Sequence, residues 1–130
     1  MFSTQFLDEG RELLQLGSGA LAGREIIEAK IALLAMADRV RKIGFALVDL
    51  SEVTSLEVTA DEVRELAGVD IRLAKIAPQA VVAIVAPQDH IFGVARMWEA
   101  MADETGWATA VFRSRPEAEA WLNARRAPAR

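Results

Sequence analysis

The stretch VDLSEVTSLEVTADEVRELA (residues 48–67) passes from an apolar strand through a hydroxyl-rich bend into an amphipathic helix. Thr59 and Glu62 have the spacing of a capping box, in which a hydroxyl and a carboxylate bond the first free amides of a helix. The pattern therefore predicts a strand that ends near residue 50 and a helix that begins after Thr59. Asp49, Ser51 and Glu57 are expected in the loop at the carboxyl end of this strand.

Strands and helices are expected to alternate along the whole chain. Uninterrupted apolar runs predict three buried strands, and a weaker alternation predicts a fourth that fits a sheet edge. The buried strands are expected over residues 43–50, 80–86 and 107–112, the edge strand over 11–17, and STQFL (3–7) is a candidate for one more edge strand. Helical spacing is expected over residues 23–40, 59–75, 89–106 and 114–126. GSGALAG (17–23) is interpreted as a flexible turn.

This alternation predicts one α/β domain over residues 1–130, with a mainly parallel sheet of four to five strands and a frayed tail at 124–130. Ile27, Ile31 and Leu34 are expected on the buried stripe of the first helix, with Lys30 outside. In the last helix, Ser114 and Glu117 fit a second capping box. Functional loops of such sheets lie at the carboxyl ends of the strands.

Composition excludes several kinds of site. The 130 residues contain no Cys and one His, which rules out disulfides, thiolate zinc sites and multi-histidine metal sites, so no metal or cofactor is expected. A net charge of −4 argues against a nucleic-acid surface. The longest apolar run, AVVAIVAP, is too short to span a bilayer, and the first residues lack the basic charge of a secretory signal, so a cytoplasmic protein is expected.

Two residues are candidates for catalysis. Asp49 could hold magnesium or accept a phosphoryl group, but the sequence shows no accompanying set of acids or lysine, and hydrogen bonds from Asp49 and Ser51 to local amides are favoured instead. His90 could act as a general base, but no nucleophile motif accompanies it, so a solvent-facing histidine in the first helical turn is favoured. An enzyme would need Asp49, His90 and Thr59 to share one cleft. We therefore expect no enzymatic activity.

The helix predicted over residues 89–106 carries the strongest candidates for binding. Phe92, Met97, Trp98 and Met101 offer large, adaptable apolar surface, and Arg96 could bind an anion or pair with Glu99. The simplest interpretation of the apolar spacing is core packing. Because Phe92 and Met97 fall outside the main stripe, the alternatives are a homodimer interface and a pocket for a small apolar ligand.

Two stretches carry a resemblance to a known family. ALVDLSEVTSLEVTADEV (46–63) resembles the strand, loop and helix of STAS domains, the fold of the SpoIIAA anti-sigma-factor antagonists. FGVARMWEAMADETGWATAVFRSRPEAEAWL (92–122) is similar to a segment of the uncharacterised bacterial SpoIIAA-like (STAS/Sec-fourteen-like) domain family. The resemblance implies a SpoIIAA-like domain that is a non-enzymatic regulatory module acting through protein partners or self-association. Kinship with Sec-fourteen lipid-transfer domains suggests, as the alternative, a carrier or sensor of a small apolar or lipid-like ligand.

The resemblance also singles out one hydroxyl group. In antagonists that work as switches, a serine of a D-S-S-G turn accepts a phosphate, and the new charge at the helix start changes partner binding. The corresponding turn in this chain is Glu57, Val58, Thr59 and Ala60, so Thr59 is its only hydroxyl and the candidate for a phosphorylation switch. Because the capping box already uses Thr59, the interpretation as a helix cap is favoured.

Overall fold

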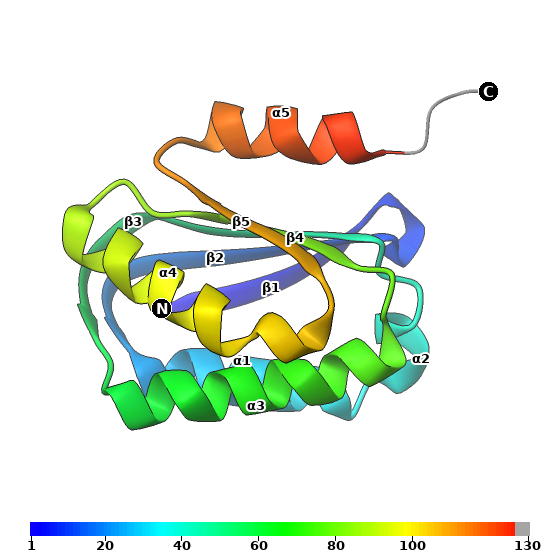
Figure 1. The fold of residues 1–130 in the computed structure, drawn as a ribbon, viewed down its shortest axis with the longest axis horizontal. Helices are drawn as coiled ribbons and strands as arrows, with labels where there is room; N and C mark the ends of the chain where they lie inside the picture. Colours follow the sequence, from blue (N-terminus) through cyan, green and yellow to red (C-terminus); the bar gives the residue numbers. More distant parts are fainter. Residues whose placement is uncertain (127–130) are drawn as a thin grey trace.

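The computed structural model describes residues 1–126, which form one sheet with helices on both faces (Figure 1). Of the predicted tail, residues 124–126 are described and the rest lies outside the described residues. In chain order the elements are β1 (Phe2–Leu7), η1 (Asp8–Gly10), β2 (Glu12–Ala22), α1 (Gly23–Leu34), α2 (Ala37–Val40), β3 (Phe45–Glu57), α3 (Ala60–Ile76), β4 (Val81–Val85), α4 (Asp89–Met101), η2 (Asp103–Thr105), β5 (Ala108–Phe112) and α5 (Arg115–Arg125).

The five-stranded sheet has the order β1-β2-β3-β4-β5, with β1 antiparallel to β2 and all other neighbours parallel. This topology confirms the predicted α/β class. The candidate N-terminal strand is present as β1, so the prediction that the strand over residues 11–17 lies at the edge is wrong. β2 is an inner strand because β1 pairs along it from Phe2↔Gly17 to Leu7↔Glu12.

β2 and β3 are much longer than the sequence predicted. β4 pairs with β3 only as far as Val85↔Asp49, whereas β2 and β3 stay paired to Ala22↔Glu57. We call residues 18–22 and 52–57 the β2–β3 extension. The interpretation of GSGALAG as a flexible turn is therefore wrong, because most of this segment is strand. Gly17 lies in close contact with the core, since a Cβ there would lie 2.9 Å from Leu50 Cδ2 and the Leu50 side chain would have to move.

The long β3 also corrects the expected position of the polar residues that follow Val48. Asp49 and Ser51 lie inside the strand, and only Glu57 lies at its end. The outer half of β3 exposes Ser51, Glu52, Thr54 and Ser55 while burying Val53 and Leu56. This part of β3 pairs only with β2, and many of its side chains face solvent and are polar. Its sequence therefore resembles that of a loop.

The helices form two unequal layers. α1, α3 and α4 cover one face of the sheet and α5 covers the other (Figure 1). The larger core lies on the three-helix face, and a smaller one beneath α5 contains Leu47, Ala83, Val85, Ala118 and Leu122.

The buried face of α1 differs from the predicted stripe. Ile27 and Leu33 are buried, whereas Ile31 is 44% exposed and Leu34 is half-buried. Lys30, which was expected outside, is buried. The buried position of Lys30 is compatible with its charge because its ammonium group pairs with Asp70 of α3.

The helix caps follow the sequence closely, with one difference. Thr59 accepts a hydrogen bond from the Glu62 amide at 3.1 Å and its own amide donates to the Glu62 carboxylate at 3.0 Å, which confirms the capping box. Ser114 caps α5 by accepting from the Glu117 amide, but the Glu117 carboxylate accepts from the Ser114 hydroxyl rather than from its backbone. The second capping box is therefore only half formed.

Candidate functional site

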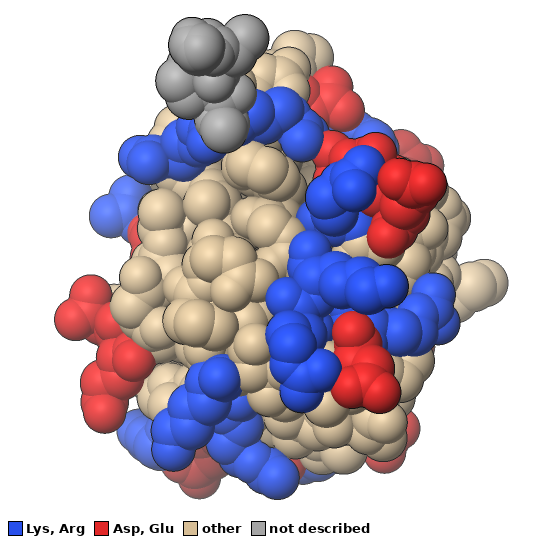
Figure 2. Space-filling view, turned by 90° about the vertical axis from the view of Figure 1, so that its right-hand side faces the viewer, with Lys and Arg blue, Asp and Glu red and all other residues tan. Residues whose placement is uncertain are grey.

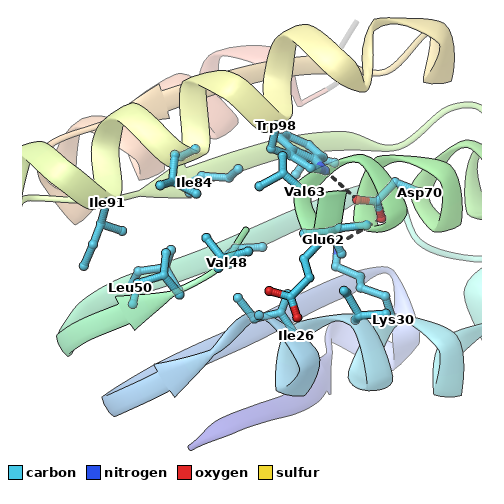
Figure 3. Close-up of a pocket in the computed structure, with 18 residues that line it drawn as sticks. Ile26, Lys30, Val48, Leu50, Glu62, Val63, Asp70, Ile84, Ile91 and Trp98 are labelled. Atoms are coloured by element: carbon cyan, nitrogen blue, oxygen red, sulfur yellow. Dashed lines mark hydrogen bonds and ion pairs between the residues drawn. The ribbon is translucent and has the colours of Figure 1, made fainter. Parts of the chain in front are cut away.

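A small apolar pocket lies between the sheet and the three helices α1, α3 and α4 (Figure 3). Its volume is about 60 Å³. We call it the core pocket, and its main walls are Ile26, Val48, Leu50, Ile84, Ile91 and Trp98. These side chains come from two helices and two neighbouring parallel strands, which hold them in fixed positions. A pocket with such walls favours an apolar group over water.

One end of the core pocket is closed by a buried polar cluster. Lys30 Nζ donates to Asp70 Oδ1 at 3.2 Å, and Trp98 Nε1 donates to Asp70 Oδ2 at 2.8 Å (Figure 3). The side chains of Lys30 and Asp70 are 9% and 0% exposed. Each residue comes from a different helix, so the cluster ties α1, α3 and α4 together. Removing either partner of a buried ion pair leaves the other charge buried without compensation, which strongly destabilises the fold.

Lys30 and Asp70 are site residues that were not predicted from the sequence. The signal was present, because Lys30 follows Ile27 by three residues and Asp70 follows Ala67 by three, so each charge occupies a core position of its helix. Opposite charges at core positions of two helices indicate a buried pair, since an unpaired charge there would be too unfavourable.

α1 and α3 also meet at the protein surface near the core pocket. Arg24 binds Glu65 through two parallel hydrogen bonds of 2.9 Å each. These hydrogen bonds, and then the positive charge of Arg24, lower the pKa of the Glu65 carboxyl below its ordinary value. At the first turn of α1, a Cβ on Gly23 would lie 2.6 Å from Val58 Cγ2, so only glycine lets α1 begin against the residue that follows β3.

The side chains predicted from α4 occupy different environments. Trp98 lines the core pocket together with Ile91, Val94 and Ala95 of the same helix. Phe92, Arg96, Met97 and Met101 do not line it. The pocket faces the buried stripe of α4, whereas Phe92 and Met97 fall beside that stripe.

Each of these other residues has its own neighbours. Phe92 is half-buried, and the guanidinium of Arg113 lies 4.1 Å from its ring centroid. Arg96 forms an ion pair with Glu99 at 3.2 Å. Met101 packs partly buried against the core, and Met97 is 38% exposed. Met97 is thus the large apolar side chain that α4 exposes most.

Asp49 belongs to the opposite side of the sheet. Its Oδ1 accepts hydrogen bonds from the amide and the hydroxyl of Ser51, and its Oδ2 lies 3.3 Å from Arg115 of α5. Thr59 and His90 lie at the starts of α3 and α4, on the other face (Figure 1). The three residues that an enzyme site would have required are therefore not brought together.

A polar surface lies where β3 passes into α3, at the left of Figure 1. Its side chains Thr54, Ser55, Glu57 and Thr59 are all exposed, and we call this surface the β3–α3 rim. Two side chains at the start of α4 support it. Gln88 Nε2 donates to the Val53 carbonyl at 2.9 Å, and His90 Nε2 lies 3.4 Å from the Leu56 carbonyl. The rim is thus held by the α4 start as well as by β2.

The opposite end of the molecule carries many Lys and Arg side chains (Figure 2). Arg39 and Lys42 line a shallow hollow there beside Gly10. Other cations are paired with acids, as Arg11 with Asp8 at 3.1 Å and Arg41 with Asp38 at 2.8 Å. The negative net charge of the whole chain conceals this uneven distribution.

Residues 1–126 contain no group of three or more His, Asp or Glu side chains placed to hold a metal ion. Within the same residues, none of the helices has both the length and the apolar character needed to cross a membrane.

Comparison with solved structures identifies the fold. The unphosphorylated form of the anti-sigma factor antagonist SpoIIAA superposes with a TM-score of 0.58 at 8% identity, covering 98% of this chain and 100% of SpoIIAA. The chain has a SpoIIAA-like fold. An uncharacterised DUF3478 protein with a SpoIIAA-like fold, from Shewanella loihica PV-4, gives a TM-score of 0.60 at 16% identity over 93% of each chain. Phosphorylated SpoIIAA, a cell fate determinant of Bacillus, gives 0.58 at 9% identity over 94% of this chain and 99% of that one.

These identities are low, so the comparison concerns the SpoIIAA-like fold and not a shared activity. No protein-family model matches the sequence, and no curated protein matches it. The sequence resemblance to SpoIIAA-like domains is nevertheless confirmed at the level of the fold.

Proposed function

We propose that this chain is a non-enzymatic regulatory module of the cytoplasm that binds a protein partner through the β3–α3 rim. The observation that carries the proposal is the exposure of Thr54, Ser55, Glu57 and Thr59 on a paired strand and a capped helix start. Exposed polar groups on a rigid scaffold bind with little loss of conformational freedom. The SpoIIAA-like fold supports the class, because SpoIIAA is an anti-sigma factor antagonist.

Charge reversal at the rim tests this proposal. Glu57→Arg places a cation in the exposed rim, and Ala120→Arg places one on the exposed surface of α5, on the other face of the sheet. Both variants are expected to fold. Recovery of a protein that co-purifies with the chain from its native host should fall at least tenfold for Glu57→Arg and stay unchanged for Ala120→Arg. Equal recovery with both variants would place the partner site elsewhere.

Thr59 has a structural role that can be measured separately from any switch. Its hydroxyl accepts the Glu62 amide hydrogen bond, so Thr59→Ala should lower the free energy of unfolding by about 1 kcal/mol. Without a switch, Thr59→Ala removes one hydroxyl group from the rim, so it should weaken partner binding far less than Glu57→Arg does. Thermal melts combined with phosphate mapping in the native host separate the two roles. A phosphorylated Thr59, with partner binding lost in Thr59→Ala, would instead show that the rim carries a phosphorylation switch.

The core pocket favours a second candidate function, the carriage or sensing of a small apolar or lipid-like ligand. The support is the apolar character of its walls and its position beneath the helix layer, which could admit a chain if α1 and α3 separate. At about 60 Å³ the pocket is smaller than such a ligand, so binding requires this separation.

Filling the core pocket tests the ligand hypothesis. Ala95 is buried in its wall, and Ala95→Val adds two methyl groups there, which should stabilise the ligand-free protein by about 0.5–1 kcal/mol. In an NMR titration with decanol, the wild type should show shifts at Val48, Ile84 and Ile91, and Ala95→Val should weaken binding at least tenfold. Ala120→Val, on the surface, is the control. Equal affinity in all three proteins would reject the core pocket as the ligand site.

Self-association through α4 stays a proposal with reduced structural support. Of the two side chains on which it depended, Phe92 already packs against the core and beneath Arg113, which leaves Met97. One exposed methionine supplies little of the apolar area that a stable dimer buries.

A further inference from the structure

β1 is an edge strand without the features that usually protect one. It pairs with β2 and with no other strand of the described residues. Its sequence, FSTQFL, has no charged residue and no proline, and its register with β2 runs without a bulge. Natural edge strands are commonly blunted by lysine, proline or a bulge, because free backbone groups otherwise pair with another chain. The edge of β1 is therefore open to a further strand.

The hydrogen bonds at the start of β1 show which of its backbone groups are free. The Met1 amino group donates to the Ser18 carbonyl and the Ser18 amide donates to the Met1 carbonyl, so these residues form a hydrogen-bonded pair. In an antiparallel ladder such pairs alternate with pairs that are not hydrogen-bonded. The amides and carbonyls of Ser3, Gln5 and Leu7 therefore face β2. Those of Phe2, Thr4 and Phe6 face outward.

These outward groups favour one arrangement for two copies of β1. In an antiparallel pair centred on Thr4, Thr4 lies opposite Thr4 of the second copy, and Phe2 lies opposite Phe6 in both directions. This register gives three hydrogen-bonded pairs, each of which exchanges two bonds. Moving the centre to Ser3 or to Gln5 leaves two such pairs.

The side chains are complementary in the same register. On the face covered by α1, α3 and α4, Phe2 meets Phe6 and Thr4 meets Thr4. Both aromatic and threonine pairs stabilise adjacent strands. On the opposite face, Ser3 meets Gln5. Met1 meets Leu7, and these two side chains are 71% and 42% exposed in the single chain. Apolar residues thus face apolar ones and polar residues face polar ones at every position.

We infer that two copies of this chain associate through β1 into a twofold-symmetric dimer with one continuous sheet. The occupant of the edge is a second copy because β1 is complementary to itself about Thr4. Twofold dimers are the commonest oligomers and require such self-complementarity. This surface is distinct from the β3–α3 rim and from α4, so the inference does not depend on the proposed partner.

Amide exchange in the full-length wild type tests the register directly. The amides of Thr4 and Phe6 should exchange at least tenfold more slowly at millimolar than at low micromolar protein concentration. Those of Ser3 and Gln5 should be protected at both concentrations, because β2 already binds them. Unprotected Thr4 and Phe6 amides at the highest concentration would overturn the inference.

Two variants tested by analytical ultracentrifugation complete the experiment. Thr4→Pro removes an outward amide that the β1–β2 ladder does not use, and should raise the dimer dissociation constant at least tenfold. It also removes the hydroxyl that accepts a 3.1 Å hydrogen bond from the buried Gln15 Nε2, so the single chain should be less stable as well. Met97→Glu alters the alternative surface on α4 and should leave the constant unchanged. Loss of the dimer in Met97→Glu with retention in Thr4→Pro would assign the interface to α4. A monomeric wild type across the concentration series would refute both. If Thr4→Pro fails to fold, the wild-type exchange pattern decides.

Discussion

Replacing Asp70 with Ala should lower the free energy of unfolding by about 3–5 kcal/mol, one of the two largest effects expected for a single substitution in this chain. The change leaves the Lys30 ammonium buried without a counter-charge and the Trp98 indole N–H without an acceptor. Urea unfolding followed by circular dichroism measures the loss. Asp70 also lines the core pocket. Asp70→Ala should therefore lose the hydrogen bond between Lys30 of α1 and residue 70 of α3 at that end of the pocket.

A double substitution separates charge burial from loss of packing. In Lys30→Gln/Asp70→Asn both charges are removed, the Asn carbonyl can still accept from Trp98 Nε1, and the Asn amide can donate to the Gln carbonyl. We expect most of the lost stability to return, because a buried ion pair can be replaced by uncharged groups of similar size at little net change. A double variant as unstable as Asp70→Ala would show that the cluster does not act through charge pairing.

Trp98→Ala should lower the free energy of unfolding by a similar amount, about 3–5 kcal/mol, because it removes a large side chain that is 5% exposed. The vacated volume joins the core pocket, which would then be large enough for a small aromatic molecule. Benzene should therefore raise the melting temperature of Trp98→Ala and leave the wild type unchanged.

Trp121→Ala is the matched control for this result. Trp121 lies on α5 and packs against Phe112 with the ring centroids 5.7 Å apart, on the other face of the sheet from the core pocket. Its removal should destabilise the protein less and produce no response to benzene. The same response in both variants would mean that benzene binds without using the core pocket.

The sequence predicted the alternation of strands and helices well, because these elements are specified by local patterns. Thr59 and Glu62 fixed the start of α3, and the apolar run over residues 80–86 identified the inner strand β4. The lengths of β2 and β3 could not be predicted in the same way. Their outer halves stabilise each other through pairing between residues far apart in sequence, and each alone has the composition of a turn.

The candidate site was predicted less well than the fold. Trp98 was identified from its size. The other α4 residues that line the core pocket include Ile91 and Ala95 on the buried stripe of the helix, whereas the sequence had suggested residues beside that stripe. Lys30 and Asp70 are 40 residues apart, and although each occupies a core position of its own helix, no local pattern pairs the two charges. Only the packing of α1 against α3 makes them partners. The position of β1 at the edge likewise depends on the order of the strands in the sheet, which no local sequence pattern predicts.

Photo-crosslinking in living cells can show whether the chain binds a protein through the β3–α3 rim. A photoreactive amino acid at Ser55 lies on the rim, and one at Ala120 lies on the exposed surface of α5; both sites are exposed, which matches them as probe and control. We predict a discrete adduct with one host protein from Ser55, none from Ala120, and loss of the Ser55 adduct when Glu57→Arg is introduced. An adduct of the same protein from both positions, or none from Ser55 while Ala120 gives one, would contradict the account.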